Sequence, residues 1–250
     1  MDLKLEGRAA LVTGASSGIG RAIARALARE GARVAVTGRR RENLEALAAE
    51  VRGEGGTPPV IVVHDAMDAG YVEVVATEVS AALGPVQVLV NNAGGSRAFG
   101  KDATDAQWDE AFTLNFTRHR QLTNRLLPGM TEGKWGRVIN ITGKSEPDNV
   151  NGAFCAKAAL TAWSKGLSRE VGKHGITVNC IPPGRILSDQ ILRNYTPEYR
   201  AWQSEHEIPM GRYGEPEELA DLAVFLASPR AGYITGAVYP VDGGLRRYQY

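Results

Sequence analysis

Short apolar runs alternate with longer amphipathic segments from the beginning of the chain almost to its end. Each run is nearly continuous in apolar residues, which is typical of strands in a parallel sheet that is covered on both faces. Seven such runs predict strands at residues 9–13, 33–37, 60–64, 86–91, 137–141, 176–181 and 237–241. Helical periodicity is clearest at residues 20–30, 42–52, 106–127, 154–174 and 217–227. This alternation predicts an α/β fold, a Rossmann-type doubly wound parallel sheet of seven strands with helices on both faces.

The chain contains no internal repeat, low-complexity tract or long linker, so we expect residues 1–250 to form one domain. One segment interrupts the alternation. Residues 185–214 are too long for a simple connection and carry Tyr195, Tyr199 and Trp202, so they predict a small helical lid with apolar surface for an organic substrate.

Charge and composition exclude several classes of partner. The 29 basic and 28 acidic residues nearly cancel, which gives no electrostatic reason to expect a nucleic-acid partner. No apolar stretch has the length of a membrane span or of a signal peptide. Cys155 and Cys180 form no CxxC pattern, and we interpret Cys155 as a buried structural cysteine. The histidines show no metal-ligand spacing, so no metal site is expected, and the composition favours a cytoplasmic protein.

A glycine-rich turn follows the first predicted strand. It reads Thr-Gly-Ala-Ser-Ser-Gly-Ile-Gly over residues 13–20 and leads directly into a predicted helix. Glycines let backbone amides approach a pyrophosphate closely, and the positive end of the helix attracts its charge. An ordinary glycine-rich turn needs no such context, whereas this one has the strand before it and the helix after it. The turn therefore predicts dinucleotide binding.

The glycine spacing and several later motifs resemble the short-chain dehydrogenase/reductase family, and in particular members similar to 3-oxoacyl-acyl-carrier-protein reductases. The motifs include Asn-Asn-Ala-Gly at residues 91–94, Asn179 with Pro-Gly at 183–184, and Val-Asp-Gly-Gly at 241–244. The resemblance covers the whole chain and implies a homotetramer. It also implies the following cofactor contacts: Gly14, Ser16, Ser17, Gly18, Ile19, Asp65, Ala66, Asn92, Ala93, Gly94, Lys157, Pro183, Gly184, Ile186 and Ser188.

The end of the second predicted strand favours NADP(H) over NAD(H). Members that use NAD place a carboxylate there, which accepts the ribose hydroxyls and would repel a 2′-phosphate. Here Gly38 is followed by Arg39, Arg40 and Arg41. A guanidinium matches a phosphate in shape and in charge, so Arg39 is the first candidate for the 2′-phosphate contact and Arg40 is the second. The remaining arginines suit a solvated helix start.

The resemblance fails at two catalytic positions. The family's tyrosine stands four residues before its lysine, on the same helix face, and its serine follows the fifth strand. Asn115 and Lys157 match the family's asparagine and lysine, but Ala153 stands at the tyrosine position and Gly143 at the serine position. Neither can move a proton. The loop between residues 143 and 153 is also short for the family.

Lys144 and Ser145 follow the vacant serine position and are candidate replacements, although Glu146 could neutralise Lys144 in a surface pair. Three functions remain open. The first is an NADP(H)-dependent oxidoreductase that acts on a small carbonyl or alcohol substrate with an atypical proton donor. The second is a catalytically impaired NADP(H)-binding pseudoenzyme or sensor. The third is lyase or isomerase chemistry in the same cleft.

Overall fold

The computed structural model describes residues 2–97, 99–143 and 147–247. Six parallel strands form one sheet in the order β3-β2-β1-β4-β5-β6. The strands are β1 (Ala9–Thr13), β2 (Arg33–Gly38), β3 (Val60–Val63), β4 (Val88–Asn91), β5 (Gly136–Ile141) and β6 (Ile176–Ile181). The predicted Rossmann-type α/β fold is therefore confirmed. The strand order reverses between β1 and β4, which leaves a crevice at the carboxyl ends of these strands, where such folds bind ligands.

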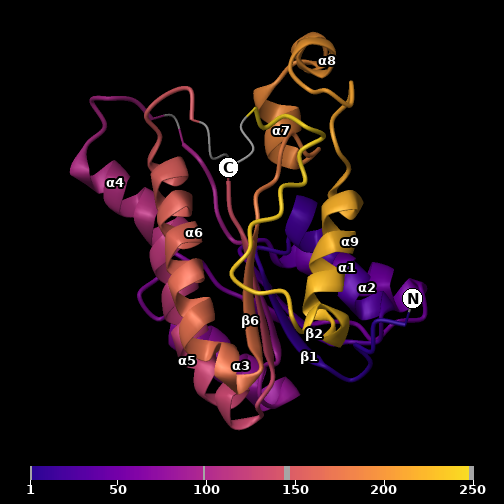
Figure 1. Cartoon of the computed structure of the whole chain (residues 1–250). Coiled ribbons are helices and arrows are strands. Elements are labelled where there is room, and N and C mark those ends of the chain that lie inside the picture. The colour runs from indigo at the N-terminus through magenta and orange to yellow at the C-terminus, as the bar shows by residue number, and fades with distance from the viewer. Residues whose placement is uncertain (1, 98, 144–146, 248–250) are drawn as a thin grey trace.

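Helices cover both faces of the sheet, as the alternating pattern predicts (Figure 1). One face carries α1 (Gly18–Arg29), α2 (Arg41–Gly53) and α9 (Pro216–Ala227). The other carries α3 (Tyr71–Leu83), α4 (Asp105–Phe112), α5 (Arg118–Glu132) and α6 (Gly152–Val171). Short helical turns are η1 (Thr113–Thr117), η2 (Gly172–His174) and η3 (Pro229–Ala231).

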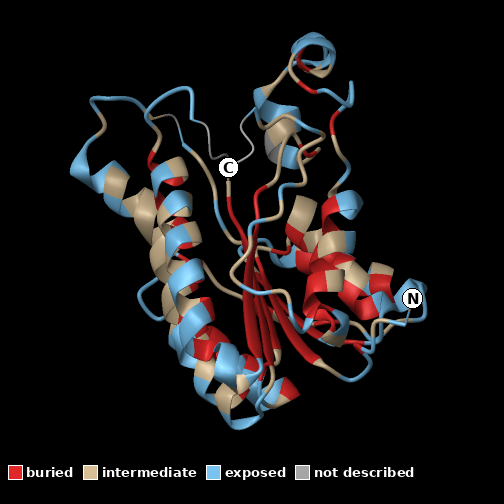
Figure 2. Cartoon of the chain, viewed as in Figure 1, coloured by how far each residue is buried: buried red, intermediate tan, exposed pale blue. Residues whose placement is uncertain are grey.

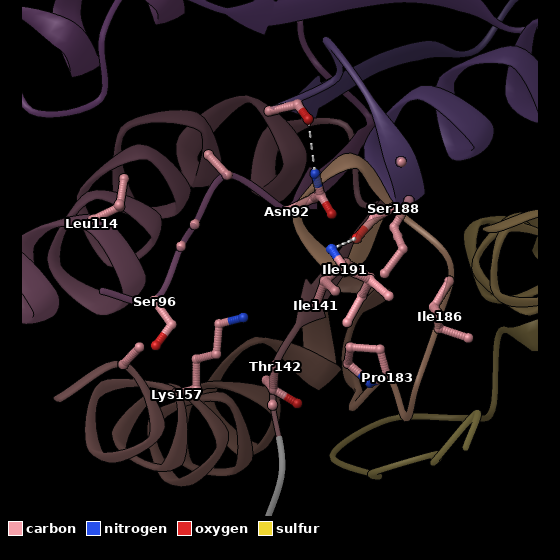
Figure 3. Close-up of a pocket in the computed structure, with 18 of the residues that line it drawn as sticks. Asn92, Ser96, Leu114, Ile141, Thr142, Lys157, Pro183, Ile186, Ser188 and Ile191 are labelled. Atoms are coloured by element: carbon pink, nitrogen blue, oxygen red, sulfur yellow. Dashed lines mark hydrogen bonds between the residues drawn. The ribbon is translucent and has the colours of Figure 1, made fainter. Parts of the chain in front are cut away.

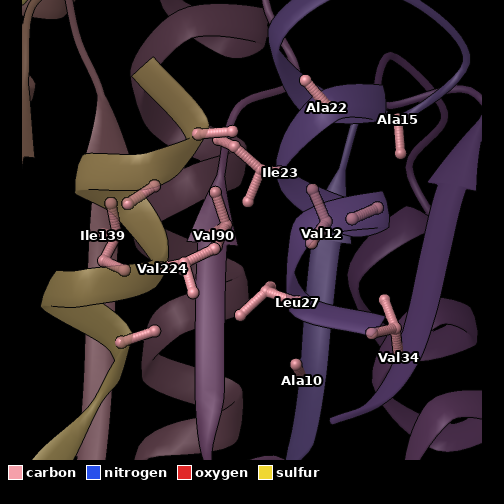
Figure 4. Packing of buried hydrophobic residues seen from close by; sticks show 14 of the residues in the cluster. Ala10, Val12, Ala15, Ala22, Ile23, Leu27, Val34, Val90, Ile139 and Val224 are labelled. Atoms are coloured by element: carbon pink, nitrogen blue, oxygen red, sulfur yellow. The ribbon is translucent and has the colours of Figure 1, made fainter. Parts of the chain in front are cut away.

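Two apolar layers, one on each face, hold the helices to the sheet. Buried residues are concentrated in the strands and on the inner sides of the helices (Figure 2). In the first layer, Ile23 and Leu27 of α1 and Val224 of α9 pack over Val12 and Val90 (Figure 4). Full burial of each such side chain stabilises the fold by about 1.5–3 kcal/mol. This packing fixes the carboxyl ends of the strands, from which the site is built.

The predicted seventh strand forms only in part. Residues 237–241 lie parallel to β6 and its extension, but they make isolated bridges, Cys180 with Val238 and Pro183 with Val241, and no continuous ladder. Tyr239 and Val241 donate to Cys180 and Pro182, and Cys180 and Gly184 donate to Ala237 and Val241, but Pro182 has no N–H, so the ladder is interrupted there. The expectation of a regular strand there is corrected by this geometry.

Residues 185–214 lie above the carboxyl ends of the strands, where α7 (Asp189–Asn194) and α8 (Pro197–His206) project from the body of the molecule (Figure 1). We call this segment the lid. Both helices are capped by a side chain, since Ser188 accepts a hydrogen bond from Ile191 and Thr196 accepts one from Tyr199. Over the described part of the chain, no helix is both long and apolar enough to span a bilayer.

Candidate functional site

A cavity of about 1110 Å³ opens at the carboxyl ends of the strands, between the glycine-rich turn, the lid and residues 245–247 near the carboxyl end of the chain. Its wall contains every residue that the sequence singles out for cofactor binding. These are Gly14, Ser16, Ser17, Gly18, Ile19, Arg39, Arg40, Asp65, Ala66, Asn92, Ala93, Gly94, Lys157, Pro183, Gly184, Ile186 and Ser188. Figure 3 shows several of these side chains converging on the space.

The glycine-rich turn is tied to the Asn-Asn-Ala-Gly segment after β4. The Asn92 side-chain amide donates to the carbonyl oxygens of Thr13, at 2.9 Å, and of Gly14, at 3.1 Å. In return, the Thr13 hydroxyl accepts hydrogen bonds from the backbone amides of Asn92 and Ala93. Gly14 has a φ of +66°, and a Cβ there would lie 2.7 Å from the Ala93 Cα. Glycine is therefore required where the two segments meet.

Helix α1 begins at Gly18, directly at the cavity. Its N-cap residue, Ser17, forms no side-chain hydrogen bond to the first turn, so the amides at this end are not satisfied by a capping side chain. Free amides and the helix dipole together attract an anion. The turn thus has the geometry that a pyrophosphate needs.

Arg39 and Arg40 lie at the same end of the cavity but point to different partners. Arg39 is 66% exposed and forms an ion pair with Asp65 at 3.6 Å. Arg40 reaches over the glycine-rich turn, where it donates to the hydroxyls of Ser17, at 2.8 Å, and Ser16, at 3.3 Å.

Arg40 also pairs with Asp189 of the lid at 3.4 Å. Its guanidinium therefore spans from the turn to the first residue of α7. The sequence ranks Arg39 above Arg40, whereas Arg40 is the arginine that contacts the turn.

Lys157 of α6 extends its side chain into the other half of the cavity (Figure 3). Its Nζ forms no hydrogen bond or ion pair with any described residue. Burial lowers the pKa of Lys157 from 10.5 to about 8, because the surrounding protein disfavours the charged form. Gly143 lies beside it, and a Cβ on Gly143 would stand 2.9 Å from the Lys157 Cδ. The lysine thus occupies space that a larger residue at position 143 would need.

Ala153 lies four residues before Lys157 on α6, and it also lines the cavity. No proton-transferring group comes from either Ala153 or Gly143. Lys144 and Ser145, the replacements suggested by the sequence, lie outside the described residues.

Asn115 lies behind the cavity rather than in its wall. It sits in η1, a π-helical turn of the kind that occurs often at functional sites. Its side chain accepts a hydrogen bond from the Gly95 amide and donates to the carbonyl oxygens of Gly95 and Ala111. The asparagine therefore holds the segment after β4 in place. One turn later, burial lowers the pKa of His119 to about 4, so this histidine is neutral at physiological pH.

Two expectations about side-chain orientation are wrong. Cys155 is exposed rather than buried, since it lies two residues before Lys157 and points away from the sheet. The lid gives the cavity only part of the apolar wall that the sequence suggests. Leu192, Tyr199 and Trp202 are 55%, 42% and 47% exposed and lie outside the wall, whereas Ile186 and Ile191 are the lid's apolar contributions.

Sequence reasoning missed Thr142, the residue before Gly143. It is buried in the cavity wall, and its hydroxyl has no hydrogen-bond partner among the described residues. A threonine at the end of a strand carries no signal that would single it out. Arg97, Arg246 and Arg247 of the wall were also missed. Within residues 2–97, 99–143 and 147–247, no group of three His, Cys, Asp or Glu side chains is placed to hold a metal ion.

Comparison with known proteins accounts for this arrangement. Residues 14–246 match a family model described as enoyl-(acyl carrier protein) reductase. The chain is 36% identical to the 3-oxoacyl-(acyl-carrier-protein) reductase of Pseudomonas aeruginosa over 247 residues, which cover 97% of this chain and 99% of that protein.

Two solved structures extend the similarity to three dimensions. L-sorbose reductase from Gluconobacter frateurii, in complex with NADPH and L-sorbose, has a TM-score of 0.93 at 32% identity and covers 99% of this chain and 100% of its own. A putative NAD(P)-dependent gluconate 5-dehydrogenase from Beutenbergia cavernae, with bound NADP, has a TM-score of 0.90 at 34% identity and covers 98% and 99%. The chain belongs to the short-chain dehydrogenase/reductase family, whose members are NAD(P)-dependent oxidoreductases of carbonyl and alcohol substrates.

Proposed function

We propose that this protein is an NADP(H)-dependent oxidoreductase in which Lys157 moves the proton. The observation that carries the proposal is one cavity with the anion-attracting turn and Arg40 at one end and, at the other, a Lys157 ammonium that has no partner among the described residues. The two ends suit the phosphates and the reacting end of one dinucleotide. NADPH, when bound, supplies the hydride, and the protein has to supply the proton.

The preference for NADP(H) rests on charge at the end of β2. Gly38 supplies no carboxylate to repel a 2′-phosphate, and Arg40 places its guanidinium beside the hydroxyls of Ser16 and Ser17. A phosphate at this point would accept hydrogen bonds from all three side chains. The NADPH and NADP found in the two similar structures support the same choice.

The choice of Lys157 as the proton donor follows from the residues at positions 153 and 143, which carry no hydroxyl. With alanine at 153 and glycine at 143, we infer that the family's tyrosine and serine are both absent from this site. Among the described residues, Lys157 has no hydrogen-bond or ion-pair partner, and a pKa of about 8 suits an acid near neutral pH. Below pH 8 its ammonium can protonate the oxygen of a carbonyl that accepts a hydride. Above pH 8 the neutral amine can remove the proton of an alcohol.

Lys144 and Ser145 stay alternative donors, and kinetics with NADPH over a panel of small carbonyl compounds separates the candidates. Lys157→Met should lower kcat by about 100- to 10,000-fold, the usual loss for a general acid. Lys144→Ala and Ser145→Ala should leave kcat close to wild type, as should the control Lys173→Met on the exposed turn after α6. The reductive rate of wild type should fall as the pH rises through about 8.

Retention of activity in Lys157→Met, or its loss in Lys144→Ala, would contradict the assignment. The loss of both hydroxyls also favours a second function, that of an NADP(H)-binding pseudoenzyme or sensor. In that case NADPH still raises the melting temperature by linkage, but no carbonyl or alcohol in the panel changes the NADPH concentration.

A further inference from the structure

The inner end of the cavity is strongly cationic, although the whole chain is almost neutral. Six cationic side chains and three carboxylates line the wall beyond the reach of Arg39 and Arg40. The cations are Arg97, Lys157, Arg185, Arg193, Arg246 and Arg247, and the carboxylates are Asp148, Glu207 and Asp242. Arg97 forms an ion pair with Glu110 at 3.2 Å, and Arg185 forms one with Glu207 at 3.4 Å, so part of this charge is balanced. The residues come from four separate parts of the chain, so the remaining positive charge gathers only in the folded cavity.

Two carboxylates of this region accept hydrogen bonds from neutral groups of the protein. Asp242 accepts hydrogen bonds from the backbone amides of Gly244 and Arg246, at 2.9 and 3.1 Å, and so organises the turn near the end of the chain. Glu207 accepts a close hydrogen bond, 2.8 Å, from the side-chain amide of Gln203. Both carboxylates are thus held in place by neutral donors, and both keep their negative charge.

Arg185 is held at the base of the lid by a long ion pair with Glu207. Its guanidinium lies 3.4 Å from Glu207 and 3.4 Å from the Tyr195 hydroxyl, and it stands over the Tyr195 ring. Charge-assisted pairs have distances of about 2.7–2.9 Å, so both contacts are loose. The Arg185 Nε is buried with no acceptor among the described residues. The side chain is thus oriented by its neighbours while much of its hydrogen-bonding capacity is unused.

The lid turns its polar side to this region and its aromatic side to solvent. Arg193 of α7 lines the cavity and pairs with no described carboxylate, whereas Tyr199 and Trp202 of α8 are exposed and stack on each other. Apolar side chains also line the cavity, among them Leu114, Ile141, Phe154, Ile186, Ile191 and Leu245. A small substrate with an anionic group would find guanidinium groups of the lid beside this apolar surface.

We propose that the substrate is a small carbonyl or alcohol compound that carries an oxyanion, a carboxylate or a phosphate, and that Arg185 and Arg193 bind this group. The inference deepens the proposed function, since it names the substrate class of the same cavity. Arg185 lies at the base of the lid and Arg193 lies on α7, and both line the cavity. The cavity must hold a dinucleotide in the same 1110 Å³, which leaves room for a small substrate.

The test measures anion binding directly and does not depend on turnover. Nucleotide-free protein is titrated by calorimetry with malonate, with its neutral counterpart malonamide and with inorganic phosphate. Three variants locate the site: Arg185→Gln at the inner end, Arg40→Gln at the glycine-rich turn, and Arg52→Gln on the exposed surface of α2 as a matched control. Malonate should bind and malonamide should not. Arg185→Gln should weaken malonate binding about tenfold or more, the usual cost of a lost bond to a charged group.

The other variants should separate the two ends of the cavity. Arg52→Gln should leave malonate affinity unchanged, and Arg40→Gln should weaken phosphate binding at the cofactor end alone. Phosphate that also binds in an Arg185-dependent manner, and more tightly than malonate, identifies the substrate group as a phosphate. Equal affinity for malonate and malonamide, or undiminished malonate binding by Arg185→Gln, overturns the inference. A failure of the proposed function is recognised separately, as anion binding without any NADPH turnover.

Discussion

Replacing Lys157 by methionine should stabilise the protein at neutral pH. The folded state lowers the pKa of this lysine from 10.5 to about 8, because it buries the ammonium and offers it no acceptor. One pKa unit corresponds to about 1.4 kcal/mol, so the charged lysine destabilises the fold by roughly 3 kcal/mol. Methionine has a similar shape and no charge, so it removes this cost.

The sign of the pH dependence follows from proton counting. Between pH 8 and 10.5 the unfolded chain keeps the Lys157 proton while the folded protein releases it, so stability rises with pH through this window. Below about pH 8 both states are protonated and the full cost is present. The advantage of Lys157→Met should therefore be largest at pH 7 and should shrink towards zero as the pH approaches 10.5.

Urea unfolding at pH 7, 8, 9 and 10 measures this directly, with Lys173→Met as the control at an exposed lysine. The control should show no pH-dependent difference from wild type. If the stability difference between Lys157→Met and wild type is the same at pH 7 and pH 10, the lysine is not desolvated in the folded state. The proton-donor assignment then loses its physical basis.

Further predictions concern the cofactor, the wall and the assembly. Arg40→Gln should weaken NADPH binding about tenfold or more and leave NADH binding unchanged in fluorescence titrations. Thr142→Val should leave the urea midpoint unchanged or raise it, because the buried hydroxyl has no partner, and should raise KM if that hydroxyl meets the substrate. Light scattering should report a homotetramer, and Trp163→Glu on the outer side of α6 should shift it to smaller species.

The fold could be predicted from the sequence because the strands of a parallel sheet are buried on both faces. Runs such as residues 9–13 and 176–181 are nearly all apolar, and the structure has strands at the same bounds, Ala9–Thr13 and Ile176–Ile181. The partial seventh strand is the informative exception. Pro182 has no N–H to donate to this strand, and apolar periodicity does not register the loss of a hydrogen-bond donor.

The residues that the sequence assigns to cofactor binding line one cavity, and they could be grouped because they follow one another in local motifs. The residues of the inner end form no such motifs. Which side of a short helix faces a cavity depends on how the lid packs. The sequence alone therefore does not show that Ile191 lines the cavity while Leu192 is exposed to solvent. The contribution of Arg246 depends on where the chain passes after α9, more than a hundred residues beyond the glycine-rich turn.

Ala153 lies four residues before Lys157 and Gly143 lies beside it, so larger polar residues at these positions should change the pKa of Lys157. A tyrosine hydroxyl at position 153 would share the cavity with Lys157 and accept a hydrogen bond from its ammonium, which favours the charged form and raises its pKa. A serine at 143 would also displace the lysine side chain, given the 2.9 Å approach. In Ala153→Tyr/Gly143→Ser, the rise of stability between pH 8 and 10.5 should therefore diminish. In this background, Lys157→Met should stabilise the protein by less than it stabilises wild type. Proton transfer should pass to the tyrosine, so the reductive rate should no longer fall near pH 8. An unchanged pH profile in the double variant would mean that these positions do not control the lysine.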